Sequence, residues 1–335
     1  MTTIKPYKLE QGGCIGIISP ASEIYSFPRR LERAVKSLTS SGFKVELGRN
    51  ALKNHGYEAG TPQDRADDIH SFFKSHHINA ILCATGGYTS NTVLKYLDFN
   101  LIKNNPKPLI GFSDATALLL GVYCKANITT FHGLSLLPSF GDKNGVHPDS
   151  LLSFQDALCN LEKERKLRLS FDQYSDENLS WDGADDRARL YLKDEGAICL
   201  NGGVAKGRLM GGNLDTLIGI IGSEYCPDFT GSLLFLEENA GTVSKTLRNL
   251  QSLEYSNLLS KAVGIVWGRC CQYNDNPSPY DLQTYLAHLG VKYDIPVVYN
   301  APIGHTEPKI TIPIGVEALL NADLCELTIL ETSVI

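Results

Sequence analysis

The chain has 335 residues, of which 43% are hydrophobic and 20% are charged, and its formal net charge is -6. This composition is that of a globular protein and excludes disordered and fibrous classes. The acidic balance leaves no broad basic surface for a phosphate backbone, so we expect no nucleic acid partner.

Short apolar runs alternate with amphipathic helical patterns through the first half of the chain. The apolar runs at 15–20, 44–48, 78–84 and 107–112 predict strands, and the periodic segments at 27–38, 62–75 and 114–124 predict helices. This alternation is typical of a parallel sheet covered by helices on both faces. We predict a doubly wound α/β domain over residues 1–160.

The pattern changes between residues 161 and 204, where charged and turn residues surround isolated apolar ones. This segment is predicted to be a linker or an exposed excursion. Short β-type runs then return at 232–236, 262–267, 296–299, 310–314 and 324–330, with fewer helices between them. We predict a smaller, β-rich α/β domain over residues 205–335.

The compartment and the metal content are inferred from what the sequence lacks. No window approaches the ~20 apolar residues of a membrane helix, and residues 1–6 lack the apolar run of a signal peptide. The nine cysteines are scattered and show no zinc-ligand spacing, which is typical of buried thiols in a reducing compartment. We expect a cytoplasmic protein with no membrane partner and no metal site.

Ser113 occupies the junction between a predicted strand and a predicted helix, in Gly111-Phe112-Ser113-Asp114-Ala115-Thr116. A tight turn there lifts the hydroxyl above the sheet edge, and the first amides of the helix can stabilise an oxyanion. The alternative is that Ser113 or Asp114 only caps the helix. Ala115 departs from the G-x-S-x-G pattern and argues against an ordinary α/β-hydrolase.

Gly86 and Gly87 end the preceding predicted strand, so they are expected at the same rim of the sheet as Ser113. Paired glycines there can point N–H groups at a ligand and so act as oxyanion donors. The alternative is a turn that requires a positive φ. The pair is not a G-x-G-x-x-G fingerprint, so dinucleotide binding is weakly supported.

A serine nucleophile requires a base and a group that orients the base. His132 and His305 both follow apolar runs and adjoin glycines, whereas the other six histidines lie among polar residues or on a helix flank. Glu237 and Glu238 end the apolar run 233–236, and the alternative is that both are solvated loop acids. The residues alone therefore leave two candidate bases and two candidate acids.

Five short motifs, taken in order, resemble the LD-carboxypeptidase family of serine peptidases: Gly86-Gly87-Tyr88, Gly111 to Thr116, Gly211-Gly212-Asn213-Leu214, Leu234 to Glu238, and Gly304-His305. The resemblance spans nearly the whole chain. It implies a flavodoxin-like N-terminal domain, a β-rich C-terminal domain, and a Ser-Glu-His triad in the cleft between them.

The resemblance also assigns roles to matching positions. It implies that Ser113 is the nucleophile, that His305 is the general base, and that Glu237 orients His305. The amide of Asp114 and one of Gly86 and Gly87 match the oxyanion donors. Two further positions in these motifs, Asn213 and Glu238, are predicted to bind substrate.

Two groups in this family differ in substrate. One group comprises murein-tetrapeptide carboxypeptidases, and the other resembles the microcin C immunity protein and cleaves an amide that joins a peptide to a modified nucleotide. Thr85 in place of the usual arginine, Asn91, the run 138–141 and Trp181 make this chain more similar to the second group. Trp181 could stack on a nucleobase or could anchor the excursion to the domain surface.

The resemblance thus implies an amidohydrolase that acts on a small peptide or peptidyl-nucleotide substrate, needs no cofactor and forms a homodimer. Murein LD-carboxypeptidase activity is the first alternative. A nucleotide-dependent oxidoreductase is a second alternative, but this chain lacks the first-strand glycine fingerprint and the acidic ribose partner that such an enzyme would need. A non-catalytic binding module would leave the combination of Ser113, Glu237 and His305 unexplained.

Overall fold

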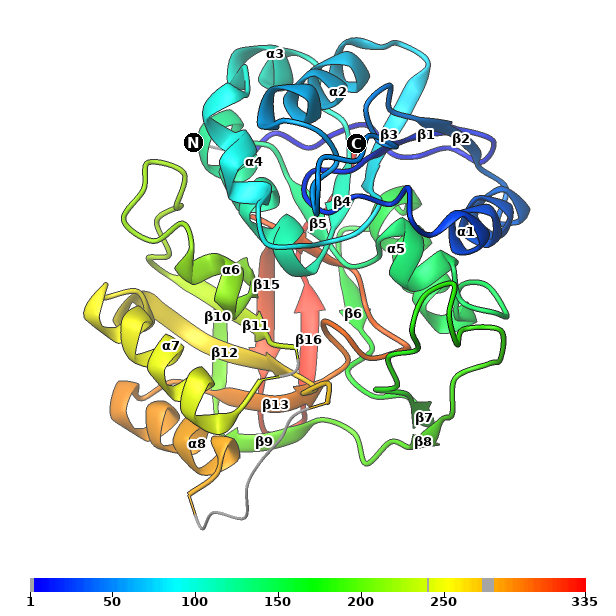
Figure 1. Cartoon of the computed structure of the whole chain (residues 1–335). Coiled ribbons are helices and arrows are strands. Elements are labelled where there is room, and N and C mark those ends of the chain that lie inside the picture. The colour runs from blue at the N-terminus through cyan, green and yellow to red at the C-terminus, as the bar shows by residue number, and fades with distance from the viewer. Residues whose placement is uncertain (1–2, 240, 273–279) are drawn as a thin grey trace.

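Two β-sheets organise the chain, and the helices of each half pack against its own sheet (Figure 1). The computed structural model describes residues 3–239, 241–272 and 280–335. In Figure 1 the first sheet, with the blue to green helices, lies above the second, with the yellow and orange helices. The predicted two-domain α/β architecture is confirmed.

The first sheet has six strands in the order β14-β5-β4-β3-β1-β2. Five of them are parallel neighbours, and β14 pairs antiparallel with β5. Their bounds are β1 (Cys14–Ile18), β2 (Lys44–Leu47), β3 (Ile78–Cys83), β4 (Leu109–Gly111), β5 (Thr130–His132) and β14 (Ile312–Ile314).

Helices cover both faces of this sheet because its central strands are apolar on both sides. In β3, Ile81 and Cys83 face one core cluster, whereas Ala80 and Leu82 face the other. The first cluster also takes the buried faces of α2 (Pro62–Lys74), α3 (Phe99–Asn104) and α4 (Thr116–Ala126), and the second takes those of α1 (Pro28–Ser40) and α5 (Pro148–Cys159). The short turns η1 (Ser90–Tyr96), η2 (Ser113–Ala115) and η3 (Leu136–Phe140) complete this half.

The second sheet has eight strands in the order β6-β16-β15-β10-β11-β12-β13-β9, of which β10 to β13 run parallel. Its strands are β6 (Arg165–Leu167), β9 (Ile198–Asn201), β10 (Val204–Asn213), β11 (Ser232–Glu237), β12 (Ala262–Gly268), β13 (Val297–Ala301), β15 (Glu317–Asn321) and β16 (Glu326–Ile329). The helical segments of this half are α6 (Leu214–Ile218), α7 (Val243–Tyr255), η4 (Leu259–Lys261) and α8 (Leu282–Tyr293).

The structure differs from the sequence expectation at several places. The segment 161–204 is not only an excursion, because it supplies β6 and β9 to the second sheet and the small hairpin β7 (Gln173–Tyr174) and β8 (Leu192–Lys193). The predicted strand at 310–314 joins the first sheet as β14, although it lies in the C-terminal part of the sequence. Of the helices that the structure describes, none is long and apolar enough to span a membrane.

Candidate active site

Ser113 lies two residues after the end of β4, in the tight turn that leads into α4. Its φ is +60°, a left-handed conformation that non-glycine residues adopt rarely and mostly at functional or strained sites. Two glycines make room for this turn. A Cβ on Gly111 would lie 2.8 Å from the Cβ of Ala115, and a Cβ on Gly86 would lie 3.0 Å from Ser113 Oγ.

Ser113, His305 and Glu237 form a hydrogen-bonded chain. The distance from His305 Nε2 to Ser113 Oγ is 3.0 Å, and that from His305 Nδ1 to Glu237 Oε2 is 2.8 Å. Both distances lie within the range for a nucleophile, its base and the group that orients the base. The serine comes from the first half of the fold, while Glu237 ends β11 and His305 follows β13.

Glu237 is fully buried, yet its surroundings favour the ionised carboxylate. Burial works to raise the pKa of Glu237, but the charge and hydrogen bond of His305, with the hydrogen bond from the Asn213 amide, hold this pKa below its usual value. Asn213 Nδ2 donates to Glu237 Oε1 over 3.1 Å. An ionised Glu237 accepts a hydrogen bond from the Nδ1–H of His305, and Nε2 is left free to accept from the serine hydroxyl.

Gly304 allows Glu237 to reach His305. Its φ is +98°, and a Cβ at this position would lie 2.5 Å from Glu237 Oε2. A larger residue would therefore displace the carboxylate from the imidazole. A glycine is therefore required next to His305 for steric reasons, because only glycine leaves room for the Glu237 carboxylate.

His132, the other candidate base, lies beside Glu237 at the end of β5. Its Nε2 is 3.9 Å from Glu237 Oε1, and its side chain is only 1% exposed. The ring packs edge-on against Phe112 and Phe235. Burial lowers the pKa of His132 to about 4, so the ring is neutral at physiological pH. It is His305, not His132, whose Nε2 is within hydrogen-bond distance of Ser113 Oγ.

The buried His132 predicts an acid-sensitive fold. Because its folded pKa of about 4 lies below the unfolded value of 6.5, the unfolded state binds the proton more readily between these pH values. We expect the free energy of unfolding to fall by up to roughly 3 kcal/mol from this residue as the pH drops through that window. Urea unfolding at pH 7 and pH 4.5 should show a smaller acid loss for His132→Asn than for wild type, and an equal loss would contradict this.

Of the predicted oxyanion donors, Gly86 lies beside the Ser113 side chain, and Gly87 lines the same cavity. The Cβ position of Gly86 would lie 3.3 Å from the backbone nitrogen of Asp114 as well as beside Ser113 Oγ. Gly87 has a φ of +149° and packs against Ser22, which also donates its N–H to Gly86 O. The Asp114 carboxylate accepts from the Ser90 N–H, so only its backbone amide is a candidate donor. The donor role of these amides remains a prediction.

Two cavities meet at Ser113. The first, here called the Trp181 pocket, has a volume of about 330 Å³, and its walls include Trp181, Phe27, Pro138, Arg189 and Lys309. The second, here called the Lys245 pocket, has a volume of about 320 Å³, and its walls include Tyr88, Asn91, Asn213, Asp215 and Lys245. A substrate with groups on both sides of a scissile bond could therefore extend into both cavities.

Trp181 lies against the first half of the fold and also lines the Trp181 pocket. Its ring lies edge-on to Phe27 with centroids 5.3 Å apart, and the Arg30 guanidinium lies 4.9 Å from the ring centroid. These contacts attach the excursion to α1 and its preceding residue. The same side chain also forms part of the wall of the Trp181 pocket.

The two other predicted substrate-binding residues are placed differently from each other. Asn213 lines the Lys245 pocket and contacts Glu237. Glu238 is 1% exposed and forms no part of either wall; it accepts from the Thr246 hydroxyl and lies 3.5 Å from Lys245 Nζ. Sequence reasoning missed the pocket cations Arg189, Lys245 and Lys309, since isolated cations carry no spacing signal. Within the described ranges, no three His, Cys, Asp or Glu side chains gather to hold a metal ion.

Comparisons with known proteins support the resemblance seen in the sequence. The LD-carboxypeptidase N-terminal domain matches residues 15–133, and the LD-carboxypeptidase C-terminal domain matches residues 206–320. The Microcin C7 self-immunity protein MccF of Escherichia coli is 31% identical, with 96% of this chain and 94% of that protein aligned. The probable murein peptide carboxypeptidase of Bacillus subtilis is 32% identical over 95% of this chain and 91% of its own.

Solved structures agree with these sequence matches. MccF in complex with aspartyl sulfamoyl adenosine has a TM-score of 0.92 and 30% identity, covering 99% of this chain and 100% of that one. An MccF-like protein from Bacillus anthracis has a TM-score of 0.89 and 32% identity, covering 98% and 99%. The chain therefore belongs to the LD-carboxypeptidase family and is a serine carboxypeptidase, a hydrolase.

Proposed function

We propose that this protein hydrolyses the amide of aminoacyl or peptidyl nucleotides through a triad of Ser113, His305 and Glu237. The observation that carries the proposal is the continuous hydrogen-bonded chain from Glu237 through His305 to Ser113. Its serine end opens into both cavities, since Ser113 contributes to the walls of each.

The proposed reaction follows from this geometry. Ser113 Oγ attacks the amide carbonyl while His305 Nε2 accepts its proton, and the developing oxyanion is stabilised by backbone N–H groups at Gly86 or Gly87 and Asp114. His305 then returns the proton to the leaving nitrogen, and water hydrolyses the acyl-enzyme by the same route. Glu237 stabilises the imidazolium in both steps. These steps use only residues of the chain and water.

The two cavities support a nucleotide substrate. The leaving nucleoside would enter the Trp181 pocket and stack on the indole face opposite Arg30, with Arg189 and Lys309 near its anionic linkage. The acyl group would enter the Lys245 pocket, where the ammonium suits a carboxylate. The structural relative MccF has been solved with aspartyl sulfamoyl adenosine and with glutamyl sulfamoyl guanosine, which contain these same parts.

Replacing Trp181 with alanine tests the nucleoside assignment. Base stacking on an aromatic ring contributes about 1–3 kcal/mol, so Trp181→Ala should lower kcat/KM for an aminoacyl sulfamoyl adenosine roughly ten- to a hundredfold. The same variant should hydrolyse a small ester without a nucleobase at the wild-type rate. Steady-state kinetics on both substrates checks the expectation.

Murein LD-peptide hydrolysis is the competing function, because a probable murein peptide carboxypeptidase is equally similar to this chain. The wild-type enzyme should therefore be assayed with an LD-tetrapeptide beside the nucleotide substrate. A clear preference for the tetrapeptide, unaffected by Trp181→Ala, would assign the protein to murein recycling. Trp181 would then serve only as an anchor.

A further inference from the structure

The segment 176–190, here called the Trp181 segment, carries Asn178, Trp181 and Arg189 into the wall of the Trp181 pocket. It has little regular structure of its own, so its position depends on side-chain contacts with the first half of the fold. Besides Asp185, which accepts from the guanidinium groups of Arg30 and Arg33, these contacts are made at two points, Asp182 and Arg189.

Asp182 caps a helix that lies more than 150 residues earlier in the sequence. Its two carboxylate oxygens accept the N–H groups of Arg29 and Arg30, over 2.9 and 2.7 Å, in the first turn of α1. The N-cap residue of α1, Phe27, makes no side-chain cap of its own. A carboxylate at this end of a helix also interacts favourably with the helix dipole.

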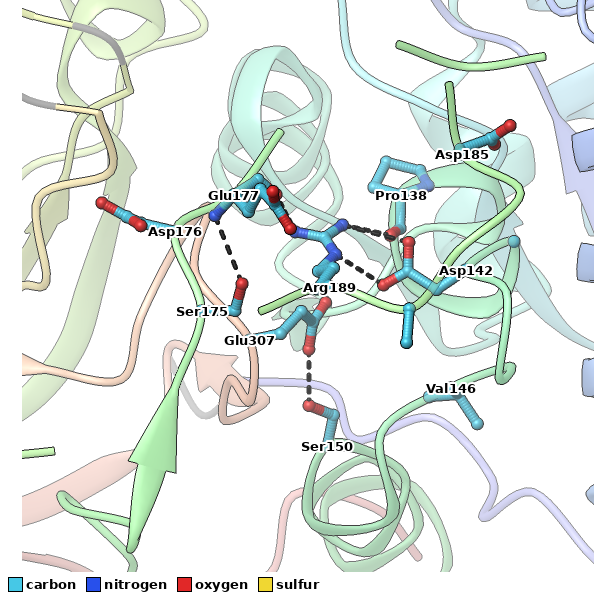
Figure 2. A network of polar contacts seen from close by, with 12 residues as sticks. Pro138, Asp142, Val146, Ser150, Ser175, Asp176, Glu177, Asp185, Arg189 and Glu307 are labelled. Atoms are coloured by element: carbon cyan, nitrogen blue, oxygen red, sulfur yellow. Dashed lines mark hydrogen bonds and ion pairs between the residues drawn. The ribbon is translucent and has the colours of Figure 1, made fainter. Parts of the chain in front are cut away.

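Arg189 forms the second point of attachment. Its guanidinium donates to the Asp142 carboxylate, over 2.7 Å from Nε, and to the carbonyl oxygens of Pro138 and Glu177 (Figure 2). Asp142 also accepts from Arg30, which lies against the Trp181 ring. The two attachment points therefore meet at the same buried arginine.

The backbone conformation at Asp182 restricts which residues can occupy this position. Its φ is +56°, in the left-handed region that favours glycine, asparagine and aspartate. Trp181 and Asp182 are adjacent, so the residue that caps α1 is joined directly to the indole that contacts Phe27 and Arg30. Asp186, in the same segment, is exposed.

We propose that Asp182 is a positioning residue: by capping α1 it holds Trp181 on the wall of the substrate pocket, and it thereby sets the affinity for the nucleoside. The claim that Asp182 sets the affinity for the nucleoside, here called the affinity clause, rests on the proposed function. The claim that Asp182 holds Trp181 in place, here called the positioning clause, concerns the protein alone. Asp182 contacts no reacting atom, so the rate of the chemical step should not depend on it.

Two substitutions separate the cap from the backbone strain. Asp182→Ala removes both acceptor oxygens, and Asp182→Gly removes them while suiting the positive φ. Asp182→Asn keeps one side-chain oxygen and tolerates the same φ, so it should rescue the function. Asp186→Ala is the matched control in the same segment.

The first readout needs no substrate. The chain has two tryptophans, and Trp267 is fully buried. A Trp181→Phe variant gives the emission of Trp267 alone, which is subtracted to obtain that of Trp181. Acrylamide quenching of the Trp181 emission should increase in Asp182→Ala and Asp182→Gly, and should match wild type in Asp182→Asn and Asp186→Ala. Unchanged quenching in the first two variants would overturn the proposal.

The second readout is kinetic. Asp182→Ala and Asp182→Gly should raise KM for an aminoacyl sulfamoyl adenosine about tenfold, or about 1.4 kcal/mol, with kcat and the turnover of a small ester unchanged. If Trp181→Ala raises this KM and the Asp182 variants do not, the affinity clause is wrong. If Trp181→Ala itself has no effect, the nucleotide assignment fails, while quenching still decides the positioning clause.

Discussion

Replacing Ser113 with alanine should abolish turnover while the protein stays folded. The substitution deletes the group that attacks the carbonyl but removes only one hydroxyl from a small side chain. Loss of a triad nucleophile lowers the rate on the order of 10⁴- to 10⁶-fold. The measurement is kcat on an aminoacyl sulfamoyl adenosine, with circular dichroism to verify folding and a fluorophosphonate probe to verify that the label is lost.

Ser135→Ala is the matched control for this experiment. Ser135 is buried, lies after β5 and lines neither cavity at Ser113. It should keep wild-type activity and fluorophosphonate labelling. Retention of even a tenth of wild-type activity by Ser113→Ala would refute the nucleophile assignment.

Replacing His305 with alanine should lower kcat nearly as much as losing the serine, by about 10⁴-fold or more. This variant leaves Ser113 without a base and Glu237 without the imidazole that it orients. His132→Asn should keep most of its kcat, because His132 contacts the far oxygen of Glu237. Parallel kcat measurements on the two variants distinguish the two histidines that the sequence could not separate.

The opposite pattern would change only part of the mechanism. If His132→Asn were inactive and His305→Ala active, the serine could still be the nucleophile with a different base. Thermal melting of both variants is needed here, because His132 is buried and its replacement also affects stability. Only a variant that is folded and inactive identifies the histidine that acts as the base.

The sequence predicted four strands and three helices of the first half because each has a clear apolar pattern, whereas the three-residue strand β5 and the helices α3 and α5 were not predicted. Ser113 and Gly86 were found for a related reason, since parallel strands deliver their carboxyl ends to one rim. His305 lies in a loop without periodicity, so the residues alone left it equal to His132. Only the order of the motifs favoured it.

The contacts of the segment 161–204 could not be predicted from its residues. Its strands β6 and β9 contain only three and four residues, and they are stabilised by pairing with β16 and β13 rather than by local propensity. Asp182 gives no local sign that its partner is α1. Such contacts are decided by the tertiary fold, and a pattern within one segment does not contain them.

The antiparallel pairing of β14 with β5 means that the molecule cannot be divided at the boundary between its sheets. Ile312 pairs with His132, so the chain leaves the second half after His305, completes the edge of the first sheet, and returns as β15. A fragment that ends near residue 160 would carry Ser113 but would expose the unpaired backbone of β5. Exposed strand edges of this kind promote aggregation. The half that holds the serine therefore depends on a strand from the C-terminal part of the chain to complete its sheet.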